Sequence, residues 1–169
     1  MDVIIPDSHK NRFEESNGIV KIPAEILRQR AVEVDSVSGE ETELGIKMSA
    51  LMARNKAVGL AAPQIGVPKR VVVIKNVDAQ TPVPIIMFNP VIVETKGEQF
   101  GVEGCLSIPG LWGEVKRHES ILVEYMNFHG NTVKVRYKGF LAVIIQHEVD
   151  HLDGILFTDR ADPNTLTWK

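Results

Sequence analysis

The stretch Gln146-His147-Glu148-Val149-Asp150-His151 decides how this chain of 169 residues is interpreted. His147 and His151 stand four residues apart, so on an α-helix they share one face and both imidazoles can bind one ion. Glu148 lies about a hundred degrees round the same helix, near the ion but free to act on a bound water. A structural zinc site needs four ligands, whereas this helix offers two and a spare carboxylate. The pattern therefore indicates a catalytic metal site.

The helix that carries this motif is predicted to cover residues 140–152 and to end before Gly154. Phe140 and Ile144 precede His147 on the same stripe of the helix, and Val143 lies beside them. These apolar side chains belong either to the hydrophobic core or to the wall of a pocket for an apolar substrate side chain. Some atoms of these side chains can belong to the core while others line the pocket.

The rest of the chain indicates antiparallel sheet with one further helix. Residues 39–55 carry an apolar stripe with helical spacing, preceded by acidic residues that suit a helix N-terminus. Strands are predicted over residues 70–74, 85–95, 121–125 and 132–137, and residues 127–131 form a hairpin turn. The strands follow one another without alternating helices. We therefore expect an α+β fold, with antiparallel sheets packed around a central helix that carries the His-Glu-x-x-His metal motif.

Composition limits the class of protein. Apolar residues make up 44% and charged residues 24%, which suits one globular domain. The net charge of −3 argues against a specific nucleic-acid partner, and no apolar run approaches the roughly twenty residues of a membrane helix. The N-terminus does not resemble a secretory signal, so we expect a cytoplasmic protein. Residues 1–18 are polar and are predicted to form a loosely ordered extension before a single catalytic domain over residues 19–169.

Cys105 is the one cysteine and the best candidate for a third metal ligand. A free cysteine is often only a small buried hydrophobe, and a nucleophilic Cys/His pair is a further alternative. That pair would explain neither the second histidine nor Glu148. Two neutral imidazoles and a thiolate would leave a divalent ion with one net positive charge and an open fourth position.

Residues 58–66 combine small residues with the amide of Gln64. The segment lacks the glycine spacing and the Lys-Ser/Thr ending of a phosphate loop. It is either a tight turn between a helix and a strand or a backbone edge along which a substrate chain lies. In the second case the Gln64 amide donates to a developing oxyanion.

Three segments in this order resemble the three motifs of the peptide deformylases, and the similarity runs from about residue 18 to residue 161. The segments are Gly59-Leu60-Ala61-Ala62-Pro63-Gln64, Glu103-Gly104-Cys105-Leu106-Ser107 and Gln146-His147-Glu148-Val149-Asp150-His151-Leu152. The resemblance implies hydrolysis of the N-terminal formyl group from formyl-methionine of newly made polypeptides, releasing formate. It also implies a divalent ion, usually ferrous iron, with zinc, nickel or cobalt able to take its place.

The resemblance implies a role for individual residues. Cys105, His147 and His151 would hold the metal, and Glu148 would be the general acid and base. The Gln64 side chain and the Leu106 N–H would stabilise the oxyanion. Substrate binding falls to the following residues: Val58, Phe140, Val143 and Ile144 for the methionine side chain, and Gly59 and Gly104 for backbone pairing.

The family's partners are formyl-methionyl nascent peptides, and we expect a monomer that does not bind membranes. Many bacterial members continue into a long C-terminal helix, which this sequence lacks. A transient ribosome contact is therefore left open. Two alternatives remain: a metal-dependent amidase or peptidase acting on another blocked amine, or a formyl-peptide-binding protein with little turnover. Glu148 argues against the second, since a binding protein has no use for a base beside the metal.

Two further residues have two interpretations each. Asp150 either hydrogen-bonds or pairs with Arg117, or it is an exposed carboxylate. Trp112 either lines the mouth of the pocket or is an ordinary surface or core tryptophan.

Overall fold

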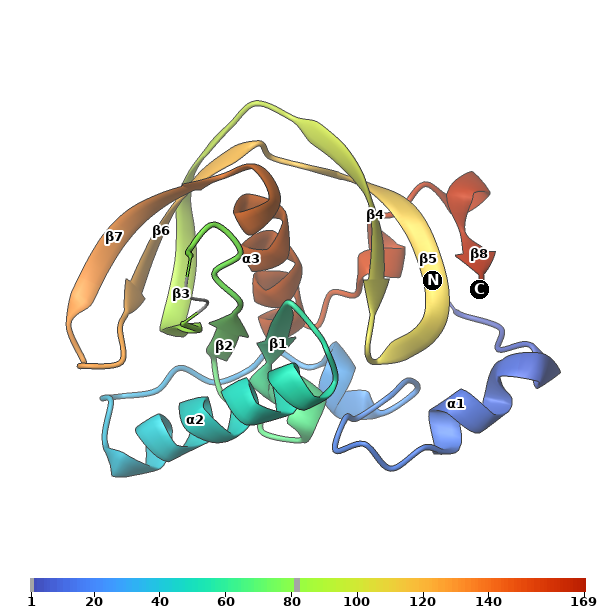
Figure 1. Cartoon of the computed structure of the whole chain (residues 1–169), viewed down its shortest axis with the longest axis horizontal. Helices are drawn as coiled ribbons and strands as arrows, with labels where there is room; N and C mark the ends of the chain where they lie inside the picture. The colour runs from blue at the N-terminus through green and yellow to red at the C-terminus, as the bar shows by residue number, and fades with distance from the viewer. Residues whose placement is uncertain (1, 81–82) are drawn as a thin grey trace.

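Helix α3 (Gly139–Leu152) lies between two antiparallel sheets, as Figure 1 shows in the computed structural model. The structure describes residues 2–80 and 83–169. One sheet has five strands in the order β1-β2-β3-β6-β7 and the other has three in the order β4-β5-β8. Every pairing between these strands is antiparallel. The predicted α+β fold with a central helix that carries the motif is confirmed.

The strands of the larger sheet are β1 (Gly59–Ala61), β2 (Val71–Ile74), β3 (Ile85–Lys96), β6 (Ser120–Met126) and β7 (Thr132–Lys138). The smaller sheet is built from β4 (Gln99–Cys105), β5 (Ile108–Arg117) and β8 (Thr167–Trp168). The strand predictions found β2, β3, β6 and β7. They missed β1, β4, β5 and β8, because these are short or rich in glycine and carry a weak strand pattern.

Helix α2 (Gly39–Arg54) covers the face of the larger sheet that is turned away from α3. It begins with a capping box, in which the Glu41 carboxylate accepts hydrogen bonds from the backbone N–H and the hydroxyl of Ser38. Strand β2 is buried on both sides because Val71 and Val73 pack towards α2, while Val72 packs towards α3. The larger sheet is thus a layer between two helices.

Helix α3 is almost wholly buried from Leu141 to Leu152, with Val143 as the exception. Such a helix fits only where both sheets cover it, which explains its continuous apolar sequence. It ends before Gly154, whose φ is +71°. A Cβ at Gly154 would lie 2.5 Å from the carbonyl oxygen of Arg28, so glycine is required there.

The N-terminal segment differs from the sequence prediction. We expected a loose extension over residues 1–18, but the described part forms a 3₁₀ helix, η1 (Asp7–His9), and helix α1 (Lys10–Glu14). Val3 and Phe13 pack against a core that includes Leu111. The physical reason is that β5 leaves an apolar surface which these two side chains cover.

The remaining helices are 3₁₀ turns: η2 (Glu25–Arg28), η3 (Ala62–Ile65), η4 (Phe157–Asp159) and η5 (Pro163–Thr165). After α3 the chain therefore forms two short turns and β8. Among the described residues, no helix is both long and apolar enough to cross a lipid bilayer.

Candidate active site and metal centre

Three potential metal ligands meet where the end of β4 faces α3. The ligand atoms of Cys105, His147 and His151 all lie within 4.8 Å of one another. The Cys105 Sγ is 3.3 Å from the His151 Nε2. The β4–β5 register shifts between Gly104 and Cys105, and such an irregularity bends a strand and redirects its side chains. The structure therefore brings together the three residues that the sequence grouped, and their role as metal ligands stays a prediction.

This donor set fits a single divalent ion. The two histidines are buried, and the Nδ1 of His147 is already bonded to the Glu103 carboxylate, which leaves its Nε2 for a metal. His151 offers the nitrogen that faces the thiol. Two imidazoles and one thiolate are suitable ligands for a catalytic ion with an open coordination position.

Glu103 orients His147 from behind. Its Oε2 lies 2.8 Å from the His147 Nδ1, and Arg117 donates to both carboxylate oxygens over 2.8 and 2.9 Å. Burial raises the pKa of Glu103, but the hydrogen bonds from Arg117 and His147 outweigh it and hold that pKa at about 2. The carboxylate is therefore charged at neutral pH, and it fixes the tautomer and the ring orientation of His147.

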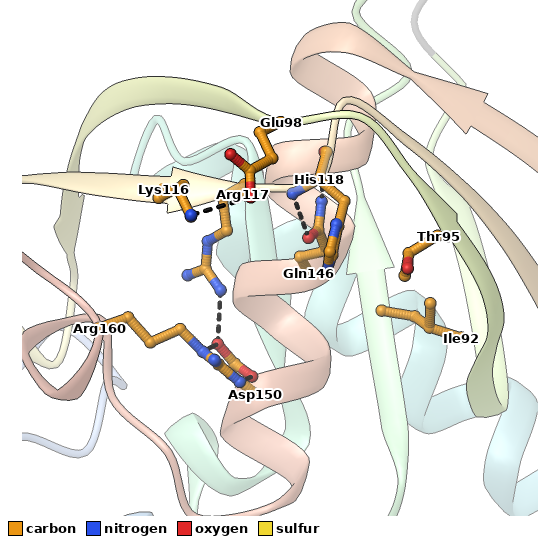
Figure 2. Close-up of a pocket in the computed structure, with 9 residues that line it drawn as sticks. All are labelled: Ile92, Thr95, Glu98, Lys116, Arg117, His118, Gln146, Asp150 and Arg160. Atoms are coloured by element: carbon orange, nitrogen blue, oxygen red, sulfur yellow. Dashed lines mark hydrogen bonds and ion pairs between the residues drawn. The ribbon is translucent and has the colours of Figure 1, made fainter.

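Arg117 is itself held by Asp150, as Figure 2 shows. The Arg117 Nη1 donates to the Asp150 Oδ2 over 2.6 Å, so the first interpretation of Asp150 is confirmed. Arg160 approaches the same carboxylate from the other side, with its Nε 2.5 Å from Oδ2 and its Nη2 2.7 Å from Oδ1. These three side chains line a cavity of about 370 Å³ behind α3. Sequence reasoning missed Arg160, since no local pattern marks it as a partner of Asp150.

Glu148 lies on the cavity side of α3 with different surroundings. Its Oε2 is buried and has no hydrogen-bond partner among the described residues. Burial raises its pKa to about 7. A Cβ at Gly59 would lie 2.5 Å from the Glu148 Oε1, so only glycine lets β1 pass this close to the carboxylate. A carboxyl group with such a pKa can take up and release a proton near neutral pH.

The Gln64 amide points at the same place. Its Oε1 accepts from the Ala61 N–H over 2.9 Å, which turns the Nε2 towards Cys105 and Ser107. The Nε2 is 3.4 Å from the Cys105 Sγ and 3.2 Å from the Ser107 Oγ. The backbone acceptor thereby fixes an amide donor beside the candidate metal ligands.

A cavity of about 610 Å³ opens in front of these groups. All but one of the site residues predicted from the sequence line it: Val58, Gly59, Gln64, Gly104, Cys105, Leu106, Phe140, Val143, Ile144, His147 and Glu148. The exception is His151, which is 1% exposed. Trp112 also lines the cavity, in agreement with the first of its two interpretations. Phe100, Gly101 and Val102 were missed, because β4 was not predicted.

The site has the parts of a metal-dependent hydrolase: three convergent ligand atoms, a buried carboxyl group beside them and an apolar cavity. Comparison with known proteins identifies the family. A sequence model of the family described as "Polypeptide deformylase" matches residues 16–166. The chain belongs to the peptide deformylase family, which removes N-terminal formyl groups from nascent peptides.

Individual relatives agree. The peptide deformylase of Desulforudis audaxviator is 44% identical over 144 residues, covering 85% of this chain and 92% of that protein. That of Acetivibrio thermocellus is 49% identical over 136 residues, covering 80% and 78%. The solved peptide deformylase of Synechococcus elongatus in complex with actinonin aligns with a TM-score of 0.82 and 36% identity, covering 86% and 80%. A probable peptide deformylase from Synechococcus phage S-SSM7 aligns at 0.81 and 39% identity, covering 84% and 97%.

Proposed function

We propose that deformylation by this protein depends on Cys105, His147 and His151 as metal ligands and on Glu148 as the proton-transfer group. The observation that carries this proposal is the buried Glu148 oxygen, which has no hydrogen-bond partner in the part of the chain that the structure describes. Glu148 lines the cavity together with Cys105 and His147. A buried carboxyl group without a partner is costly, and it is retained where its proton is used.

The mechanism follows from the placement of the side chains. A divalent ion bound at the three ligands would supply Lewis acidity, which polarises the formyl carbonyl and acidifies water. Glu148 takes the proton of the attacking water and later gives it to the leaving amine. The Gln64 amide and the Leu106 N–H donate to the oxyanion that develops on the formyl oxygen. Formate and the free amino terminus are the products.

Recognition of the substrate is assigned to the cavity wall. Val58, Phe140, Val143 and Ile144 offer apolar surface for a methionine side chain. Gly59 and Gly104 both line the cavity, on β1 and β4, and each of these strands is at the edge of its sheet. Free strand edges pair with an extended peptide, which aligns the formyl group with Glu148.

We propose ferrous iron as the resident ion, with nickel, cobalt or zinc able to occupy the same ligands. A thiolate with two imidazoles suits all four ions, so the geometry does not select among them. A thiolate beside ferrous iron is open to oxidation, which predicts loss of activity in air.

The partners that we propose are formyl-methionyl nascent chains, and we assign the protein to the cytoplasm because these chains are made there. We also propose that residues 19–169 act as a single catalytic domain in a monomer. We leave open a transient contact with the ribosome as the nascent chain emerges.

The test is release of formate from formyl-Met-Ala by anaerobically purified protein loaded with ferrous iron. We expect formate in equal amount to free Met-Ala, and far less product from acetyl-Met-Ala, whose carbonyl carbon is less electrophilic and more hindered than that of a formyl group. The Cys105→Ala variant should lose metal content in the same preparation. Folded, metal-loaded protein that releases no formate would contradict the proposal.

A further inference from the structure

Residues before 16 and after 166 lie outside the family match, yet they pack against each other. The ring of Trp168 lies 5.0 Å from that of His9 and 6.3 Å from that of Phe13, measured between centroids. The Arg12 Nη1 donates to the main-chain oxygen of Lys169 over 2.6 Å. Figure 1 shows α1 and β8 next to β5, and both contact that strand. We call residues 9–13 and 167–169 together the terminal clasp.

The terminal clasp is attached to one short part of β5. Strand β8 pairs Trp168 with Leu111, and the Lys169 N–H donates to the Gly110 oxygen over 2.8 Å. Gly110 has a φ of +93°, and a Cβ there would lie 2.7 Å from the Arg12 Nη1. Glycine is therefore needed both for this backbone conformation and for contact with Arg12. The two ends of the chain thus fix the part of β5 that lines the cavity.

The side chain that connects the terminal clasp with the cavity is Trp112. A Cβ at Gly104 would lie 2.9 to 3.0 Å from three atoms of the six-membered indole ring, so the ring lies flat against Gly104. The Lys169 Nζ is 6.0 Å from the ring centroid, within reach of a cation–π contact. Trp112 pairs with Thr167 across the β5–β8 ladder. The indole is therefore held between the terminal clasp and the residue that precedes Cys105.

Trp112 belongs to an exposed apolar strip at the mouth of the cavity. Phe100 is 66% exposed, Val102 62% and Trp112 40%, and all three line the cavity. Alternate residues of a strand share one face, so Phe100, Val102 and Gly104 lie on the same side of β4. Gly104 is the partner of Trp112 in the β4–β5 register. An apolar strip that continues from a substrate cavity is suited to contact more of the substrate.

We propose that the terminal clasp positions Trp112 to bind the peptide segment that follows formyl-methionine, and so favours substrates longer than a dipeptide. This inference rests on the proposed function. It assigns His9, Arg12 and Trp168 as positioning residues, which act through Trp112 and do not touch the reacting bond. The occupant of the strip is an apolar stretch of nascent peptide.

The experiment compares formyl-Met-Ala with formyl-Met-Ala-Leu-Leu on the full-length, iron-loaded protein. Replacing Arg12 by alanine removes one charge-assisted hydrogen bond, so KM for the tetrapeptide should rise about fivefold, with kcat unchanged. Both constants for formyl-Met-Ala should stay as they are. The Arg12→Lys variant keeps a donor and should recover part of the loss. Lys10→Ala is the matched control, since Lys10 lies on the same helix but pairs with Asp7, and it should change neither substrate.

A double-mutant cycle tests whether Arg12 acts through Trp112. Trp112→Ala should raise KM for the tetrapeptide at least as much as Arg12→Ala, and the double variant should be no worse than Trp112→Ala alone. Additive effects would overturn the proposal. So would an unchanged tetrapeptide KM in Arg12→Ala, or an equal loss with both peptides, which indicates a purely structural role. Absence of formate from formyl-Met-Ala with the unmodified protein is a different result, because it contradicts the proposed function itself.

Discussion

Two buried carboxyl groups, Glu103 and Glu148, lie beside His147, and they differ in their hydrogen-bond partners and in their pKa. Glu103 on β4 is 7% exposed and Glu148 on α3 is 5% exposed. Glu103 is bonded to Arg117 and His147, and its pKa is held at about 2. Glu148 has an oxygen without a partner among the described residues, and burial raises its pKa to about 7. Partners, and not depth, decide the charge state of these carboxyl groups.

The two sides of α3 differ in the same way: carboxyl groups are paired with arginine on one side and unpaired on the other. Behind the helix, Asp150 bonds to Arg117 and Arg160 (Figure 2). Arg117 also bonds to Glu103, so that two carboxylates balance two guanidinium groups. On the cavity side, the Glu148 proton is free to move. A fixed network can hold a metal ligand in position, whereas proton transfer needs a group that is left unpaired. The following predictions test this division.

The largest expected effect is on turnover in Glu148→Gln. The amide has nearly the same shape but neither takes up nor delivers a proton, so kcat should fall by about two to four orders of magnitude. Cys105, His147 and His151 are unchanged, and metal content should therefore remain near that of the unmodified protein. Formate release and metal analysis on one preparation check both points. Activity close to normal would remove Glu148 from proton transfer.

Replacing Arg117 by methionine should have the next largest effect. The side chain of Arg117 is 4% exposed, and its loss leaves two buried carboxylates, Glu103 and Asp150, without their shared cation. Such a change costs about 3–5 kcal/mol of unfolding free energy. Urea unfolding followed by circular dichroism measures it.

The matched control is Arg30→Met. Arg30 also pairs with a carboxylate, Glu33, but both side chains are more than half exposed, at 61% and 55%. Removing an exposed pair should leave the urea midpoint nearly unchanged, because solvent screens the two charges. If Arg117→Met were as mild as Arg30→Met, the network behind α3 would not hold Glu103 in place.

Much of this site could be predicted from the sequence because its chemistry is local. His147, Glu148 and His151 lie within two turns of one helix, so their spacing gives their geometry directly. The apolar residues Phe140 and Ile144 follow the same periodicity and do line the cavity. The α+β class was also predictable, since the strands β3, β6 and β7 carry clear alternation or β-branched runs.

The supporting groups could not be predicted because they depend on tertiary contacts. Arg117 reaches Glu103 only because β4 and β5 form a hairpin, and β4 has glycine at residues 101 and 104, which hides its strand pattern. Arg160 meets Asp150 through the turn η4, which has no periodic signal. The docking of α1 on β5 pairs segments about a hundred residues apart, and a polar sequence alone gave no sign of it.

The smallest predicted effects are the stability changes that follow when Glu148 or Glu103 is replaced by glutamine. They test the comparison of these two carboxyl groups most directly, because they should have opposite signs. Consider metal-free protein at pH 8. The pKa of Glu148 is raised from 4.5 to about 7, so ionisation of this group lowers the stability of the folded protein. The full cost is present above pH 7, and it is absent below pH 4.5. Glu148→Gln removes this cost and should stabilise the protein at pH 8 by about 1–3 kcal/mol. The gain should disappear as the pH falls towards 4.5.

Glu103 should behave in the reverse way. Its pKa is lowered from 4.5 to about 2, so its ionised form adds stability above pH 4.5, and this contribution is lost as the pH falls to 2. Glu103→Gln should therefore destabilise the metal-free protein at pH 8 by about 1–3 kcal/mol, with a difference that shrinks in acid. Urea midpoints of both variants at pH 8 and pH 5 give the comparison, since at pH 5 the gain in Glu148→Gln should be mostly lost while the loss in Glu103→Gln should remain. A shift in the same direction for both would mean that burial alone, and not the partners of each carboxylate, governs the two groups.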